Sequence, residues 1–214
     1  MQDNRGLKGI LSISSFYAHF QNLVGARHVR AWLATNYWKV NSGDKVVDIG
    51  CGPGTTLDDL PDNITYIGID ISEEYVRSAK QRFDPRATFI VGTARELVES
   101  PDPILSNSDL ILCTGLLHHL DDEEVMYVFK LAKQILNATG RLICLEPTYL
   151  VHQGYFSKWS MRRDRGRNVR TESEWKKLAS SVFKCFTTNI ATNLYRLPYI
   201  HIIIECRKET NCDT

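Results

Sequence analysis

Short apolar runs alternate with helix-like segments through the middle of the chain. Five runs rich in β-branched residues predict strands at residues 45–49, 66–70, 87–91, 110–114 and 141–146. The segments between them predict helices, because their apolar residues recur at helical spacing. Alternation of single strands with helices is typical of a mainly parallel sheet that carries helices on both faces. The pattern therefore predicts an α/β fold.

Helices are expected at residues 55–60, 73–82, 94–97 and 122–136. The sequence Asn-Ala-Thr-Gly follows the last of these, and Gly140 is expected to end the helix in the left-handed conformation. Aromatic and aliphatic residues also recur at helical spacing within the first 40 residues. This N-terminal part should pack on the sheet as an entry helix or lid.

The C-terminal part departs from strict alternation. Two β-rich runs, VFKCFTTNIA (182–191) and YIHIIIECR (199–207), are joined only by TNLYRLP. Because that connection is too short for a helical crossover, the two strands should pair antiparallel.

Composition narrows the class of protein. A chain of 214 residues with 43% hydrophobic residues can bury a core of one α/β domain, and a net charge of +1 gives no global sign of nucleic-acid or membrane binding. No signal-like N-terminus and no run of about 18 apolar residues is present, which favours a cytoplasmic protein. The six cysteines are scattered without a C-x-x-C pair, so reduced thiols are expected.

A glycine-rich turn directly follows the first strand. Gly50, Gly52 and Gly54 lie within the sequence VVDIGCGPG, where backbone N–H groups can approach a ligand closely because no Cβ intervenes. Asp70 ends the next strand, 20 residues after Gly50. This is the spacing expected of an acidic residue that hydrogen-bonds to the hydroxyl groups of a ribose. The dinucleotide pattern G-x-G-x-x-G would need glycine at position 55, where the chain has Thr55, so a nicotinamide cofactor is disfavoured.

Four motifs in this order and spacing, VVDIGCGPG, GIDIS, FIVGTARE and SDLILCTGLLHHLDDEE, resemble the class I S-adenosylmethionine-dependent methyltransferases of the small-molecule branch. The resemblance covers residues 40–147 closely. It implies a Rossmann-like, seven-stranded α/β sheet, mostly parallel, with an antiparallel C-terminal strand and helices on both faces. On this basis we expect a single domain over residues 1–214. Its parts are an N-terminal lid (1–40), a cofactor-binding core (41–147), a substrate-covering insertion (148–182) and a C-terminal strand pair (183–207).

The resemblance also implies which residues hold the cofactor, S-adenosylmethionine, and its product S-adenosylhomocysteine. The turn should surround the methionine part, Asp70 should accept hydrogen bonds from the ribose, and Ile71 should pack on the adenine. Thr93 departs from the aspartate common in the family, and its hydroxyl or the Ala94 backbone could replace that contact. The full cofactor set is Tyr17, Asp48, Gly50, Cys51, Gly52, Gly54, Asp70, Ile71, Thr93, Ala94, Thr114, Gly115 and Leu116.

Methyl transfer needs alignment and, for a hydroxyl acceptor, a base, but no nucleophilic residue of the protein. Candidates for the base or for an orienting group are His118, Glu146, Tyr149 and His152. His118 and His119 lack a third residue at metal-ligand spacing, and adjacent residues on a helix do not face the same way. No metal is therefore expected.

A basic segment lies between the fifth and sixth strands. Between residues 158 and 170 it holds one lysine and five arginines against a single acid, Asp164. Arginine suits phosphate or carboxylate, which predicts an anionic, sugar- or phosphate-bearing acceptor held by Arg165, Arg170 and His152. The alternative is a solvated cationic surface, with TESEW beginning the next helix as a capping box.

The leading hypothesis is an O- or N-methyltransferase for a small molecule, acting as a monomer or homodimer. A non-catalytic module that only binds the cofactor is the first alternative. An RNA methyltransferase is disfavoured, because no N-P-P-Y-like tetrad follows the fourth strand and no added RNA-binding domain is evident. No nucleic-acid partner is therefore expected.

Overall fold

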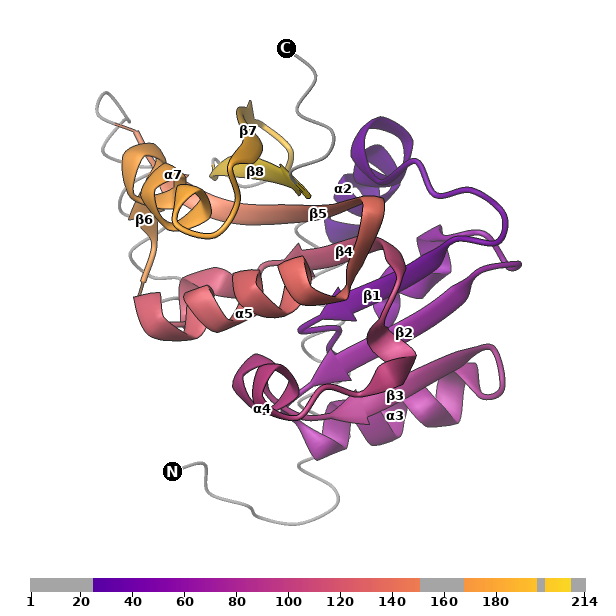
Figure 1. Ribbon diagram of the computed structural model, residues 1–214. Helices are drawn as coiled ribbons and strands as arrows, with labels where there is room; N and C mark the ends of the chain where they lie inside the picture. The colour runs from indigo at the N-terminus through magenta and orange to yellow at the C-terminus, as the bar shows by residue number, and fades with distance from the viewer. Residues whose placement is uncertain (1–24, 151–167, 196–198, 209–214) are drawn as a thin grey trace, which may run out of the picture.

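A mixed sheet runs through the molecule in the strand order β3-β2-β1-β4-β5-β8-β7 (Figure 1). This computed structural model describes residues 25–150, 168–195 and 199–208. A two-residue strand, β6, pairs with the end of β5 outside this order. The strands are β1 (Lys45–Ile49), β2 (Thr65–Asp70), β3 (Ala87–Val91), β4 (Ser108–Thr114), β5 (Leu136–Tyr149), β6 (Arg170–Thr171), β7 (Cys185–Thr192) and β8 (Ile200–Arg207).

Strand direction brings several loops to one edge of the sheet. The first five strands are parallel, whereas β8 is antiparallel to both β5 and β7. The predicted antiparallel pairing of the last two β-rich runs is thus confirmed. Because β7 again runs in the direction of β1, the loops after β1, β2, β4 and β7 leave the sheet at the same edge, where open α/β sheets bind ligands.

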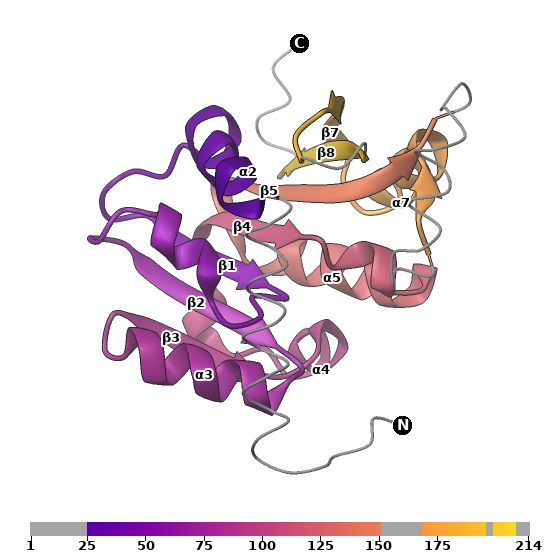
Figure 2. The ribbon, with the colours of Figure 1, turned by 180° about the vertical axis from the view of Figure 1, so that it is seen from behind.

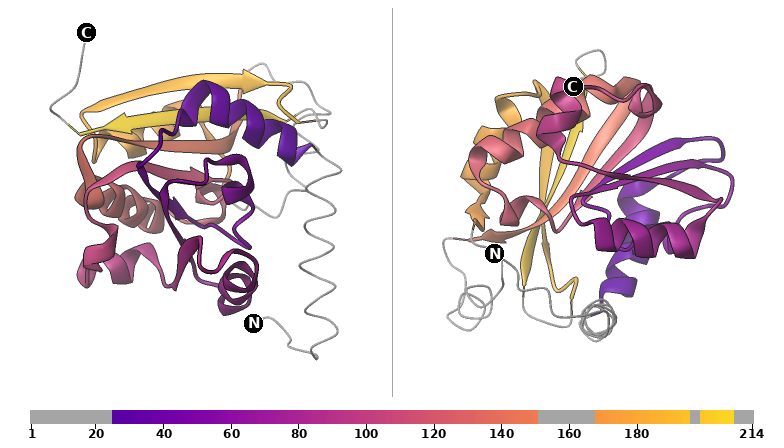
Figure 3. Two further views of the ribbon diagram at one scale, coloured as in Figure 1. Left: turned by 90° about the vertical axis from the view of Figure 1, so that its right-hand side faces the viewer. Right: turned by 90° about the horizontal axis from the view of Figure 1, so that it is seen from below.

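Helices cover both faces of the sheet (Figures 2 and 3). One face packs against α4 (Ala94–Glu99), α5 (Asp122–Ile135) and α7 (Glu172–Ser180), with Phe129 and Trp175 fully buried. The other packs against α2 (Ala26–Leu33), the π-helix η1 (Ala34–Trp38), the 3₁₀-helix η2 (Thr55–Asp59) and α3 (Glu73–Phe83). Two further 3₁₀ turns are η3 (Pro103–Leu105) and η4 (Leu117–His119).

Side-chain caps fix where the helices begin. Asp121 accepts from the N–H of Glu124 at the start of α5, and Thr171 accepts from the N–H of Glu174 at the start of α7. In both cases the glutamate carboxylate accepts from the backbone N–H of the cap residue, which confirms the capping box predicted at TESEW. Such a cap stabilises a helix by about 1 kcal/mol.

Two local predictions are wrong. Gly140 does not adopt a left-handed conformation; it lies inside β5, where an added Cβ would come within 2.6 Å of the Ser108 carbonyl oxygen. Glycine is needed there for close approach of two strands rather than for a turn. Cys185 is in a disulfide, unlike the expected thiol, whereas Cys51, Cys113, Cys144 and Cys206 are free and buried.

None of the helices within the described ranges is long and apolar enough to cross a membrane.

Candidate functional site

The glycine turn after β1 is held against the end of β2. The N–H groups of Gly50 and Cys51 both donate to the Ile69 carbonyl, at 2.8 and 3.0 Å. Gly50, Gly52 and Gly54 all have positive φ, of 78°, 54° and 75°. A side chain at any of these positions would be strained, so the turn requires glycine.

The two outer glycines pack tightly, whereas the middle one faces open space. A Cβ at Gly50 would lie 2.9 Å from the Leu116 side chain, and one at Gly54 would lie 3.1 Å from Phe83 and Phe89. A Cβ at Gly52 would meet no atom within 4 Å. The surface above Gly52 is therefore where a ligand can come close to the backbone.

Asp70 lies beside this open surface. Its Oδ2 accepts from the Gly52 N–H at 2.8 Å, and its Oδ1 accepts from the Ser72 N–H at 2.8 Å. Each carboxylate oxygen can accept more than one hydrogen bond. Asp70 thus braces the turn and retains acceptor capacity for two hydroxyl groups of a ribose.

Apolar surface continues from Asp70. Ile71 is 73% exposed, and Val91, the cross-strand partner of Asp70, is 46% exposed. Two large apolar side chains exposed beside a carboxylate suit a purine ring attached to a ribose. Thr93 is used differently from the expectation, since its hydroxyl donates to Glu96 and caps α4. The Ala94 N–H, in the first turn of α4, has no acceptor within that helix.

Asp48 lies underneath the turn rather than on its surface. It is 1% exposed, and the hydroxyl of Tyr66 donates to its Oδ2 at 2.7 Å. Burial raises the pKa of Asp48 to about 6, although hydrogen bonds from Tyr66 and Thr56 oppose this shift. Cys51 is also buried, and burial raises the pKa of its thiol. Both side chains support the turn from below.

Glu146 organises the turn that follows β4. This fully buried carboxylate accepts from three consecutive backbone N–H groups, those of Leu116, Leu117 and His118, at 3.0, 2.9 and 3.2 Å. The Nδ1 atom of His118 lies 2.7 Å from Oε2 of the same carboxylate. Since a carboxylate accepts hydrogen bonds, this contact places the ring proton on Nδ1. The structure therefore brings together two predicted candidates, one as an anchor and one as a ring oriented by it.

The ring of His118 is buried near the end of β4, with 7% of its side chain exposed. A Cβ at Gly115, just after β4, would lie 4.0 Å from Cε1 of His118. The rings of His118 and His119 are also in contact, with centroids 4.0 Å apart, although His118 is buried and His119 is exposed. Tyr149, at the end of β5, is half-buried, and its role as a base stays a prediction.

Arg170 is not placed to bind an anion, contrary to the sequence prediction. Its guanidinium donates to Oδ1 of Asp122 and to the carbonyls of Leu117, Leu120 and Asn168, at 2.8 to 3.1 Å. Its second terminal nitrogen also lies 2.7 Å from the same Asp122 oxygen, so the guanidinium is paired within the protein. Arg170 instead fastens both ends of the turn that carries His118.

Several predicted residues lie outside the described part of the chain. They include a cofactor candidate, the acceptor candidates apart from Arg170, and the rest of the basic segment. They are Tyr17, His152, Lys158, Arg162, Arg163, Arg165 and Arg167. Among the residues that are described, no group of three or more His, Cys, Asp or Glu side chains could hold a metal ion.

Sequence reasoning missed the long-range contacts of the site. The carboxylate of Glu146 accepts a hydrogen bond from Leu117, which precedes α5 and β5 in the chain. Arg170 donates to the carbonyls of Leu117 and Leu120, about 50 residues earlier in the chain. Neither spacing is a local motif. The available signal was a charged residue, Glu146, directly after the apolar run at residues 142–145.

Comparison with known proteins shows that part of the chain is similar to methyltransferases. Residues 46–140 match a family described as "Methyltransferase domain". The chain is 32% identical over 110 residues to 27-O-demethylrifamycin SV methyltransferase of Amycolatopsis mediterranei, covering 48% of this chain and 38% of that protein. It is 26% identical over 151 residues to norreticuline-7-O-methyltransferase of Papaver somniferum, covering 64% and 39%. The chain thus spans less than two fifths of either relative.

Solved structures share the fold. An S-adenosylmethionine-dependent methyltransferase from Archaeoglobus fulgidus superposes with a TM-score of 0.68 at 17% identity, covering 90% of this chain and all of that one. Human N-acetylserotonin methyltransferase, solved with S-adenosylmethionine, gives a TM-score of 0.67 at 17% identity, covering 93% and 56%. At this identity the likeness concerns the fold alone.

Proposed function

We propose that the chain is a class I S-adenosylmethionine-dependent methyltransferase and that it transfers the methyl group of S-adenosylmethionine to a hydroxyl oxygen of a small molecule. One observation carries the proposal: the Asp70 carboxylate beside an open Gly52, with exposed apolar surface next to it. These features fit the three parts of the cofactor.

In the proposed complex, Asp70 accepts from the two ribose hydroxyls while keeping its bonds to the turn. The exposed Ile71 and Val91 contact the adenine. The open backbone at Gly52 accommodates the amino-acid end of the cofactor, whose ammonium is favoured by the nearby carboxylate of Asp48. The opening at Gly115 leaves room beside His118 for the acceptor.

Oxygen is favoured over nitrogen by the pairing of His118 with Glu146. A hydroxyl acceptor must lose a proton during transfer, and a neutral imidazole held with its proton on Nδ1 can receive that proton at Nε2. The two relatives described above also carry an oxygen position in their names. S-adenosylmethionine supplies an electrophilic methyl group, so the protein contributes alignment, exclusion of water and this base.

The prediction of an anionic acceptor now depends only on Arg165 and its basic neighbours, which lie outside the described residues. Arg170 no longer supports it, because its guanidinium makes four hydrogen bonds and an ion pair with Asp122 within the protein.

The test is transfer of label from S-adenosylmethionine that carries an isotopically labelled methyl group. The protein would be incubated with a panel of phenols, alcohols and amines, and products identified by mass spectrometry, with Asp70→Ala as the inactive control. We expect label in a methyl ether together with formation of S-adenosylhomocysteine. Binding of S-adenosylhomocysteine without transfer to any compound, or to a metabolite extract, would instead favour the non-catalytic module.

A further inference from the structure

Asp48 is a buried carboxylate without an ion-pair partner in the part of the chain that the structure describes. The residue is 1% exposed, and the hydroxyl groups of Tyr66 and Thr56 hydrogen-bond to it. The charge of Arg30 in α2 acts on Asp48, but the Arg30 Nε is paired with Asp59 at 2.8 Å. Buried charges are normally paired with an opposite charge. The surroundings of Asp48 therefore suit a ligand that brings a positive charge to the glycine turn.

Tyr66 reaches Asp48 from the neighbouring strand. Asp48 on β1 pairs with Gly68 on β2, and Tyr66 lies two residues before Gly68, so it shares that face of the sheet. A Cβ at Gly68 would lie 2.7 Å from Phe89 and 2.8 Å from the Cys51 sulfur, so glycine lets these side chains pack on the strand. The Phe89 ring contacts the Tyr66 ring, with centroids 5.9 Å apart. Packing thus holds the ring of Tyr66 while its hydroxyl donates to Oδ2 of Asp48 at 2.7 Å.

The hydroxyl of Tyr66 favours the ionised form of Asp48. The polar, titratable and charged groups around this carboxylate come from β2, the glycine turn, η2 and α2, and they are Tyr66, Asp70, Cys51, Thr56 and Arg30. Burial raises the pKa of Asp48 to about 6, and the hydrogen bond from Tyr66 has the largest effect among those that oppose this shift. Burial and the charge of Asp48 raise the pKa of Tyr66 well above its usual value, so the hydroxyl keeps the proton that it donates. Asp48 is therefore mostly charged at neutral pH, with the help of Tyr66.

We propose that Tyr66 is a positioning residue of the cofactor site: its hydroxyl holds the Asp48 carboxylate in place and in its charged form, and this charge attracts the ammonium group of S-adenosylmethionine at the glycine turn. The inference rests on the proposed function and concerns the same site. Tyr66 acts through Asp48 and does not itself touch the cofactor. Cofactor affinity then depends on pH, because a proton on Asp48 removes the charge that favours the ammonium.

The first test follows the affinity for S-adenosylhomocysteine as pH changes. Calorimetric titrations between about pH 5 and pH 8 would compare the wild type with Tyr66→Phe, which keeps the ring but lacks the hydroxyl. The wild type should lose affinity as pH falls through about 6, where Asp48 gains a proton. In Tyr66→Phe the same loss should occur about one pH unit higher, the shift expected when one hydrogen bond to a charged group is removed. The titration of the ligand itself is the same for both proteins.

A ligand control isolates the ammonium group. Methylthioadenosine keeps the adenine and the ribose but lacks the ammonium and the carboxylate of the amino-acid end. Its affinity should therefore have the same pH dependence in the wild type and in Tyr66→Phe.

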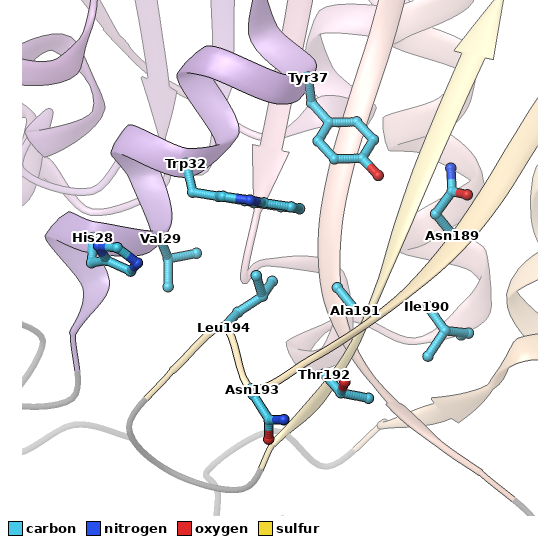
Figure 4. Close-up of a pocket in the computed structure, with 10 residues that line it drawn as sticks. All are labelled: His28, Val29, Trp32, Tyr37, Asn189, Ile190, Ala191, Thr192, Asn193 and Leu194. Carbon is cyan, nitrogen blue, oxygen red and sulfur yellow. The ribbon is translucent and has the colours of Figure 1, made fainter.

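Tyr37→Phe is the matched control variant. Tyr37 also packs on the face of the sheet that carries Tyr66, but it lies in the wall of a cavity between α2 and β7 (Figure 4). The charge that acts on its hydroxyl is that of Glu205, and none of the residues lining this cavity is assigned to the cofactor. Tyr37→Phe should therefore bind S-adenosylhomocysteine within about twofold of the wild type at every pH.

A second test needs no ligand. In denaturant unfolding, Tyr66→Phe should destabilise the protein more at about pH 8, where Asp48 is charged, than at about pH 5, where it is protonated, because the lost hydrogen bond is stronger to a carboxylate. In an Asp48→Asn background, the effect of Tyr66→Phe should not depend on pH, since the amide does not titrate.

The outcomes separate this inference from the proposed function. A wild type that does not bind S-adenosylhomocysteine would overturn the proposed function itself. If the wild type binds it and Tyr66→Phe loses affinity at the same pH, the role of Tyr66 is refuted. It is equally refuted if the pH dependence of methylthioadenosine binding shifts by as much, because Asp48 would then not act on the ammonium. A destabilisation by Tyr66→Phe that is equal at both pH values would show that the hydroxyl does not favour the charged form of Asp48.

Discussion

Replacing Glu146 by glutamine should weaken the hydrogen bonds that hold the turn carrying His118. Oε1 accepts from the N–H groups of Leu116 and Leu117, and Oε2 accepts from the N–H and Nδ1 of His118. A glutamine presents one oxygen and one NH₂ group to these four donors. Whichever way the amide is turned, its NH₂ group faces at least one buried N–H that has lost its acceptor.

The size of the effect follows from this count. Each buried donor left without an acceptor costs about 1 to 3 kcal/mol, and one or two are affected. The free energy of unfolding should therefore fall by about 1 to 6 kcal/mol, which corresponds to roughly 2 to 24 °C in Tm for a chain of this length. One donor, Nδ1 of His118, can escape by moving its proton to Nε2 and accepting from the amide.

That escape has a cost in activity. With the proton on Nε2, His118 can no longer receive one from an acceptor hydroxyl, so kcat should fall even in folded protein. The assays are denaturant unfolding and turnover of the identified acceptor, with Glu124→Gln as control. Glu124 is an exposed carboxylate that accepts from the Asp121 N–H at 3.1 Å, and its replacement should cost less than about 1 kcal/mol. Equal stability and full turnover in Glu146→Gln would show that the anchor described above is wrong.

Two further predictions use the same site. Arg170→Lys should lower the free energy of unfolding by about 2 kcal/mol, because three ammonium donors cannot replace the five fixed guanidinium donors. Calorimetry should show an affinity for S-adenosylhomocysteine within about twofold of the wild type. Weakened cofactor binding with unchanged stability would contradict this prediction. Asp48→Asn should stabilise the protein by up to about 3 kcal/mol at pH 8, since the pKa of Asp48 is raised from 3.8 to about 6 and the buried charge opposes folding above that pH. In denaturant unfolding across pH, the gain should disappear as pH falls from 6 to 4, and a gain independent of pH would exclude this cause.

Local patterns predicted the core of the fold well. The strands at residues 45–49 and 87–91 have the predicted bounds, and the helix predicted at 73–82 ends one residue later, because alternation, caps and glycine turns are properties of neighbouring residues. Asp70 was placed beside the glycine turn for the same reason, since consecutive parallel strands end at one edge.

The parts that sequence could not give depend on contacts between distant segments. Arg170 resembled an anion-binding residue because its neighbours in sequence are basic, whereas its acceptors lie about 50 residues away in the turn after β4. Glu146 resembled a base because a carboxylate at a strand end is chemically ambiguous until its donors are known. Gly140 was assigned to a turn because its close contact with Ser108 is formed only in the sheet.

Binding of S-adenosylhomocysteine by the wild type and by Asp70→Ala tests the central claim most directly. The claim is that the glycine turn and Asp70 hold the cofactor. Two charge-assisted hydrogen bonds to the ribose are worth about 1.5 to 3 kcal/mol each, so Asp70→Ala should weaken calorimetric binding at least about 30-fold even if water replaces part of the loss. Asp44→Ala is the matched control, because its carboxylate accepts from the Asn41 N–H at 2.7 Å near the opposite edge of the sheet. We predict wild-type affinity for Asp44→Ala and a large loss for Asp70→Ala; an Asp70→Ala affinity within about twofold of the wild type would contradict the account.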